Sequence, residues 1–222
     1  MPPTAEEIDA GQAIYTKATL RIYDSLVLGI FNRWIWQCPT SRLLRMYDND
    51  ISANHMEVGV GTGYLLDHCR FPTERPRIVL LDLNATCLQV AARRIARYHP
   101  EQFQANGMVP IEIDVAPFDS IGLNYVLHCL PGSMVEKAVV FQNLTPLIRP
   151  AGILFGSTLL GGGIRRSWAS RELMTYYNYW QIFSNRDDHL DQLDVALSEH
   201  FESHALEVVG SAALFAARVA TQ

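Results

Sequence analysis

The hydrophobic positions of the chain fall into short runs separated by amphipathic segments. Residues 77–83 (RIVLLDL) and 152–160 (GILFGSTLL) are apolar without alternation, as in strands that are buried on both faces of a sheet. Five other apolar stretches predict the remaining strands: residues 55–60, 108–115, 118–126, 205–209 and 212–219.

The segments between these strands have helical spacing. Asn84 can cap a helix that carries Leu88 and Ala91 on one side, and Ser133 with Glu136 forms a capping box for another helix. Strands that alternate with helices predict an α/β fold, with a doubly wound, Rossmann-like and mostly parallel sheet.

One domain is expected over residues 1–222. The pattern divides it into a helical N-terminal cap, a core, an aromatic-rich helical insert that can act as a lid, and a C-terminal helix with a strand pair. These parts span residues 1–54, 55–160, 161–186 and 187–222.

Composition excludes several classes of protein. Charged residues make up 18% of the chain and the net charge is −5, which disfavours a nucleic-acid binder held by phosphate contacts. The uncharged stretch at 25–32 is too short to span a bilayer, and no signal peptide precedes it, so a cytoplasmic protein without stable membrane insertion is expected. The 4 cysteines form no CxxC pair, so no metal site is predicted.

A glycine-rich loop gives the strongest chemical signal. The segment EVGVGTG contains Gly59, Gly61 and Gly63 between a predicted strand and a predicted helix, where backbone N–H groups can approach a ligand. Tyr64 stands where a nicotinamide-binding G-x-G-x-x-G motif needs its third glycine. Glu57, two residues before the first glycine, suits a cationic ammonium group better than a pyrophosphate.

Two further carboxylates follow predicted strands. Asp82 ends the 77–83 run, where it can accept both hydroxyl groups of a ribose. Asp114 ends the predicted third strand, where it could hold an adenine amino group. A nucleoside with an amino-acid tail has these features, and S-adenosylmethionine is such a molecule. The alternatives are a helix-capping role for Asp82 and a turn-forming role for Asp114.

Residues 55–220 resemble the class I S-adenosylmethionine-dependent methyltransferases, chiefly through EVGVGTG. The segment 124–132 (NYVLHCLPG) and the early Tyr15 and Tyr23 resemble the small-molecule subfamily of quinone and lipid methyltransferases. The resemblance implies a seven-stranded sheet whose last strand is antiparallel, and S-adenosylhomocysteine as the product. The implied cofactor-binding set is Tyr15, Tyr23, Glu57, Gly59, Gly61, Thr62, Gly63, Asp82, Leu83, Asp114, Val115 and Asn124.

Methyl transfer needs little from the protein beyond alignment, because the sulfonium is already activated. His128 follows the predicted fourth strand and is the candidate general base; the alternative is a histidine that is satisfied by backbone near the cofactor. Tyr125, Tyr176 and Tyr177 are the candidate substrate-binding residues, the last two because a phenol joins an apolar body to a polar group. The alternative is that the aromatic residues only pack the helices onto the sheet. The expected acceptor is a small aromatic or lipophilic molecule of secondary metabolism.

One feature conflicts with the implied topology. Only residues 115–117 separate Asp114 from Phe118, although the third and fourth strands lie three strand spacings apart in that fold. Four residue steps reach at most about 14 Å, which is only the lateral separation. Either the third strand ends earlier, or residues are missing between 114 and 118, and the second explanation is favoured.

Two other functions remain open. The chain could be a cofactor-binding or partner protein on the same fold that does not methylate, although the intact glycine loop and both acids argue against lost catalysis. An NAD-dependent oxidoreductase is disfavoured by the absent third glycine. The sequence does not specify the acceptor atom or the oligomeric state, and a homodimer is one option.

Overall fold

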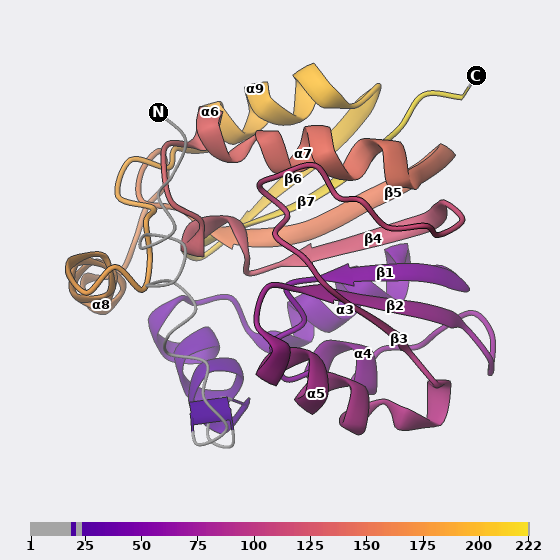
Figure 1. Cartoon of the computed structure of the whole chain (residues 1–222). Helices are drawn as coiled ribbons and strands as arrows, with labels where there is room; N and C mark the ends of the chain where they lie inside the picture. Colours follow the sequence, from indigo (N-terminus) through magenta and orange to yellow (C-terminus); the bar gives the residue numbers. More distant parts are fainter. Residues whose placement is uncertain (1–18, 21–23, 222) are drawn as a thin grey trace.

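The computed structural model describes residues 19–20 and 24–221. In them, one seven-stranded sheet has the order β3-β2-β1-β4-β5-β7-β6 (Figure 1). The strands are β1 (Asn54–Val58), β2 (Arg77–Asp82), β3 (Glu101–Gln104), β4 (Phe118–Asn124), β5 (Ile148–Leu159), β6 (Ser203–Val209) and β7 (Ala212–Arg218). Strands β1 to β5 pair in parallel, whereas β7 is antiparallel to both β5 and β6. The predicted fold class and the antiparallel last strand are confirmed.

Helices cover both faces of the sheet. The helical elements are η1 (Asp24–Ile35), α3 (Thr40–Asp50), α4 (Tyr64–His68), α5 (Ala85–Arg94), η2 (Ala96–Tyr98), η3 (Leu127–Cys129), α6 (Met134–Lys137), α7 (Val139–Leu144), η4 (Thr145–Leu147), α8 (Trp168–Tyr179) and α9 (Leu190–His200). In Figure 1, α3, α4 and α5 lie against one face, and α6, α7 and α9 lie against the other. This is the doubly wound arrangement expected from the alternating pattern.

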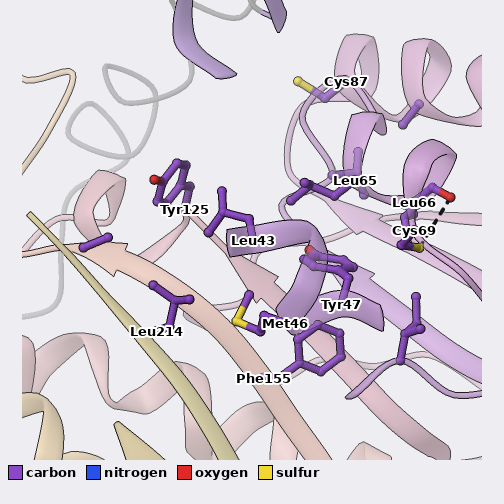
Figure 2. Packing of buried hydrophobic residues seen from close by; sticks show 14 of the residues in the cluster. Leu43, Met46, Tyr47, Leu65, Leu66, Cys69, Cys87, Tyr125, Phe155 and Leu214 are labelled. Carbon is purple, nitrogen blue, oxygen red and sulfur yellow. Dashed lines mark hydrogen bonds between the residues drawn. The ribbon is translucent and has the colours of Figure 1, made fainter. Parts of the chain in front are cut away.

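Each face has its own hydrophobic core. Tyr47 and Met46 of α3 pack against Phe155 of β5 on the first face, as Figure 2 shows. On the second face, Phe141 of α7 packs against Phe215 of β7. Strands β2 and β5 contribute to both cores, which explains why their sequences are apolar without alternation.

The third strand lies earlier than predicted. It is β3, at the edge of the sheet, and three of its four residues are exposed, so no apolar run marks it in the sequence. The alternating stretch at 108–115 is not a strand. Its Ile111, Ile113 and Val115 pack against the second core, so their periodicity reflects one-sided burial without a paired partner.

The early position of β3 also removes the conflict in chain length. Residues 105–117 connect β3 to β4 across the positions of β2 and β1. A segment of that length spans up to about 40 Å, well beyond the lateral separation of about 14 Å. The favoured explanation, a missing segment between Asp114 and Phe118, was therefore wrong, and the alternative of an earlier strand end was right.

Candidate functional site

The main pocket lies at the carboxyl ends of β1, β2 and β4, the edge where open α/β sheets bind ligands. Its walls come from the glycine loop, from the ends of these strands, from η3 and from Leu28 of η1. The predicted cofactor residues on its wall are Glu57, Gly59, Gly61, Thr62, Gly63, Asp82, Leu83 and Asn124. The structure thus brings together side chains from positions 57 to 124.

The three loop glycines have positive φ angles, of 74°, 51° and 73° at Gly59, Gly61 and Gly63. A Cβ atom on Gly59 would lie 2.2 Å from Cγ2 of Val126, and one on Gly63 would lie 3.0 Å from the Cα atom of Ala91. At Gly61 a Cβ atom would meet nothing within 4 Å, because the pocket lies there. The loop therefore combines close packing at its ends with an open middle that faces the pocket.

Asp82 organises this loop. Its Oδ2 accepts a hydrogen bond from the backbone N–H of Val60 at 2.8 Å, and its Oδ1 accepts one from the N–H of Asn84 at 2.8 Å. Burial raises the pKa of Asp82, and the backbone N–H donors oppose that rise. The N–H groups of Gly61 and Leu83 also act on this carboxylate, so backbone donors of the glycine loop and of the segment after β2 hold Asp82 on the pocket wall.

Glu57 lies at the other end of the loop and is 4% exposed. Its Oε1 accepts a hydrogen bond from the Tyr47 hydroxyl at 2.5 Å, and its Oε2 lies 3.0 Å from Nε2 of His55. Burial, and then the neighbouring Glu57, raise the pKa of Tyr47 well above its usual value, so the phenol stays a donor. These contacts use two of the carboxylate's four acceptor positions.

A charged contact attaches η1 to the glycine loop. Oδ1 of Asp24 accepts a hydrogen bond from the Thr62 hydroxyl at 2.6 Å, and its Oδ2 accepts one from Arg94 at 2.6 Å. Arg94 also donates to the Thr62 hydroxyl at 3.1 Å. We call this set, Asp24, Thr62 and Arg94, the η1 clasp; it holds Leu28 on the wall of the pocket.

The predicted adenine contact is not where the sequence suggested. Asp114 is exposed and Val115 half-buried, and neither lines the pocket, because both lie in the connection that follows β3. Asn106, Gly107 and Met108 occupy the corresponding wall instead. The dipeptide Asn106-Gly107 predicts a turn from the sequence. Its place on the pocket wall could not be predicted, because it follows the exposed strand β3, which the sequence pattern does not mark.

His128 is buried and does not line the pocket. Its Nδ1 accepts a hydrogen bond from the backbone N–H of Leu159 at 3.3 Å, and its ring packs edge-on against Phe183. Burial, with a smaller effect of Lys137, lowers the pKa of His128 to about 3. This geometry corresponds to the alternative of a histidine satisfied by backbone, and it gives no support to the general-base prediction.

The candidate substrate residues separate into two groups. Tyr125 lines the pocket with a φ of 57°, a strained value for a residue other than glycine. Its hydroxyl donates to Oδ1 of the buried Asn32 at 3.1 Å. Tyr176 and Tyr177 lie on α8, away from the pocket wall; Tyr177 packs against Phe183. Tyr15 and Tyr23 lie outside the described residues.

Sequence reasoning missed several other residues of the wall. Among them are Leu28, Asn84, Cys129, Leu130, Pro131 and Val140. Most of them come from the loops after β2 and β4, where residues that follow a strand end could have been included on the rule that ligands bind at carboxyl ends.

Comparison with known proteins identifies the family. A sequence model of a methyltransferase domain matches residues 56–154. Demethylluteothin O-methyltransferase of Streptomyces thioluteus is 38% identical over 212 residues, which cover 96% of this chain and 92% of that protein. The chain belongs to the S-adenosylmethionine-dependent methyltransferases. The physcion biosynthesis cluster O-methyltransferase of Aspergillus chevalieri, 33% identical over 97% of this chain and 97% of its own length, is a second relative of the methyltransferase.

The solved structures agree on the fold. The DhpI complex with S-adenosylhomocysteine has a TM-score of 0.71 at 15% identity, and the match covers 99% of the methyltransferase and 100% of that chain. The enzyme is thus a class I, small-molecule methyltransferase that uses S-adenosylmethionine as cofactor. Among its described residues, no helix is long and apolar enough to cross a membrane.

Proposed function

We propose that this methyltransferase methylates a hydroxyl oxygen of a small aromatic or lipophilic acceptor. The observation that carries the proposal is the pocket at the carboxyl edge, where Glu57 and Asp82 flank the glycine loop. The choice of oxygen is supported by the relatives named O-methyltransferases, which match over most of their length.

Three parts of the pocket would bind the cofactor. Asp82 would accept the ribose hydroxyls, Glu57 would accept the ammonium group, and residues 106–108 would line the adenine. At Gly61 the pocket is open, because a Cβ atom there would meet no other atom within 4 Å. When bound there, the cofactor supplies an activated methyl group on a sulfonium.

The side chains on the described wall favour an acidic hydroxyl as the acceptor. They include neither histidine nor lysine, and the two carboxylates already receive hydrogen bonds from the protein. With His128 buried off the wall, the described residues offer alignment and exclusion of water in place of a dedicated base. A phenol or an enol, which loses its proton more readily than an alkyl alcohol, suits such a site.

Two elements lie near the edge of the sheet where the acceptor would bind. η1 reaches the pocket through Leu28, and the aromatic helix α8 lies on the side to which β1 and β4 point (left in Figure 1). We propose that both contribute to a lid over the methyl-bearing end. The single-domain organisation, the cytoplasmic location and a homodimer also remain proposals for this enzyme.

The first prediction tests the cofactor assignment. Asp82→Ala removes a charged acceptor of two hydrogen bonds and should weaken S-adenosylhomocysteine binding by about 2–4 kcal/mol. Titration calorimetry measures the change, and urea unfolding checks that the variant is folded. Unchanged affinity would remove the ribose role from Asp82.

The acceptor class is tested with labelled S-adenosylmethionine and matched aromatic compounds that carry a hydroxyl, an amine or a thiol on one ring system. The proposal expects methyl transfer to the hydroxyl compound above the other two. Transfer mainly to the amine or the thiol would contradict it while leaving the family assignment intact.

A further inference from the structure

A buried hydrogen-bonded chain leads away from Glu57. Its Oε2 lies 3.0 Å from Nε2 of His55, and Nδ1 of His55 lies 2.8 Å from the Ser120 hydroxyl. The Ser120 hydroxyl donates to the Ser52 hydroxyl at 2.8 Å, and Ser52 donates to the carbonyl oxygen of Asn54 at 2.8 Å. His55 and Ser120 are 0% exposed, whereas Ser52 is half-buried, so the chain runs from the pocket to the surface.

Counting protons along this chain determines the direction of each hydrogen bond. A carbonyl oxygen only accepts, so the single hydroxyl proton of Ser52 goes to Asn54. The Ser120 proton then goes to Ser52, and the Ser120 oxygen must accept from Nδ1–H of His55. The contact between Nε2 of His55 and Glu57 also needs a proton. All four contacts are satisfied together only when His55 and Glu57 hold one proton more than a neutral imidazole and a carboxylate hold.

With the extra proton, His55 and Glu57 form an imidazolium and a carboxylate, whose charges sum to zero. The surroundings of the pair favour this charge state. Gly122 of β4 leaves room for the Glu57 carboxylate, since a Cβ atom at Gly122 would lie 2.3 Å from Oε2 of Glu57. The ring of Phe155 stacks on the imidazole, with centroids 5.8 Å apart. A lone carboxylate in such a place would be costly, and an imidazolium beside it offsets that cost.

We propose that His55 and Glu57 share this extra proton, and that the ammonium group of the cofactor displaces it on binding. The proposal rests on the proposed function in one respect, namely that Glu57 accepts the ammonium. In the free enzyme His55 is the cationic partner of Glu57; in the complex the ammonium takes that place. His55 acts through Glu57 and is a positioning residue.

The displaced proton has a route to solvent. The Nδ1 proton of His55 passes to the Ser120 oxygen, the Ser120 proton passes to Ser52, and the Ser52 proton passes to water. One proton leaves, His55 becomes neutral, and Ser120 now donates to Nδ1. No electron is transferred, and no co-reactant is needed.

The other titratable groups around the pair stay neutral. Tyr47 of α3 faces Glu57 with a raised pKa, and burial raises the pKa of Cys69, after α4, to about 12. From β4 and β5 the neighbours are Ser120, Gly122 and Phe155, which do not titrate. Asp82 lies on the same pocket and would contact the ribose, so a ligand with a ribose but no ammonium controls for it.

The experiment is titration calorimetry at pH 6.5 in phosphate and in Tris, whose ionisation enthalpies differ. S-adenosylhomocysteine binding to the unaltered enzyme should release protons, and its affinity should increase as the pH rises, by up to about tenfold per pH unit. Methylthioadenosine, which has the nucleoside without the amino-acid tail, should release none. His55→Gln should bind S-adenosylhomocysteine without proton release, and its affinity should no longer rise with pH.

Each other outcome has a defined meaning. If the unaltered enzyme binds S-adenosylhomocysteine without proton release, or if His55→Gln releases as much as the unaltered enzyme, the proposal is overturned. If His55→Gln fails to fold by circular dichroism, Ser120→Ala replaces it and should release less, because Nδ1–H loses its acceptor. If the unaltered enzyme does not bind S-adenosylhomocysteine at all, the proposed function fails, and the proposal with it.

Discussion

Gly61 and Gly63 have left-handed backbones for different reasons. Gly63 begins α4, and a side chain there would press on the backbone of α5 at Ala91. Gly61 faces the space that the cofactor would fill. Gly63 is therefore required mainly for folding, whereas Gly61 is required mainly for ligand binding.

Alanine substitution at each glycine tests that separation. Gly61→Ala should cost about 1 kcal/mol of unfolding free energy through its positive φ, and it should weaken S-adenosylhomocysteine binding at least tenfold. Gly63→Ala should cost about 2–3 kcal/mol, because the contact with Ala91 adds to the strain. Urea unfolding and calorimetry measure the two effects. Equal losses of stability would show that the packing contrast does not matter.

At the scale of single residues, the sequence predicted the site residues that directly adjoin a clearly predicted strand. The glycine loop and Asp82 adjoin strands with clear apolar runs, so their place at the sheet edge followed from the pattern. Asn106 and Met108 were missed because they follow an exposed edge strand. The burial of His128 off the pocket wall could not be predicted, because it depends on packing against Phe183, far along the chain.

Among the elements, η1 is attached to the core by several polar contacts, and the η1 clasp is the contact that joins it to the glycine loop. In the η1 clasp, the side chains of Arg94 and Asp24 are only 27% and 21% exposed, so their ion pair is partly shielded from solvent. Thr62 links the same pair to the glycine loop. Opening the clasp would uncover the wall that Leu28 provides.

Replacing Arg94 with methionine should therefore loosen η1. We expect Arg94→Met to destabilise the clasp by about 1–2 kcal/mol, to speed amide exchange across η1 and to accelerate cofactor release several-fold. Arg93→Met, on the exposed neighbouring position, is the matched control. Hydrogen exchange followed by mass spectrometry gives the readout. Identical exchange of η1 in both variants would mean that the clasp does not hold this element.

Buried strands were easier to predict than exposed ones. Four consecutive residues of β2 are buried, and its run of apolar residues revealed it, whereas three of the four residues of β3 are exposed. The stretch at 108–115 has the alternating pattern of a strand because one side of it packs on the core. Alternation of apolar and polar residues indicates only that one side of an extended segment is buried. Whether the segment is a strand depends on pairing with a neighbour, which a single sequence does not show.

For the molecule as a whole, His128 should make stability depend on pH. Its folded pKa of about 3 lies below the ordinary value of 6.5, so the unfolded chain binds a proton that the folded chain does not. Stability is therefore complete above about pH 6.5 and decreases as the pH falls towards 3. Between pH 7 and pH 5 this histidine should remove about 2 kcal/mol of unfolding free energy.

Urea denaturation at pH 7, 6 and 5 checks this expectation. The His128→Gln variant will be less stable at pH 7, but its loss between pH 7 and pH 5 should be smaller than that of the unaltered enzyme by about 2 kcal/mol. The difference between the two slopes is the readout, so the lower starting stability does not affect it. Parallel pH profiles would show that the histidine is protonated alike in both states.

The position of β7 has a consequence for the order in which the molecule assembles during synthesis. β7 is the last strand along the chain, yet it lies between β5 and β6, and β6 pairs with β7 alone. Every described residue of the pocket wall lies between Leu28 and Val140, so a ribosome delivers them all before β6 and β7 exist. Until Arg218 has emerged, the outer edge of β5 has no partner and can pair with another nascent chain. The ligand-binding half can therefore form early, while closure of the sheet waits for its final strand.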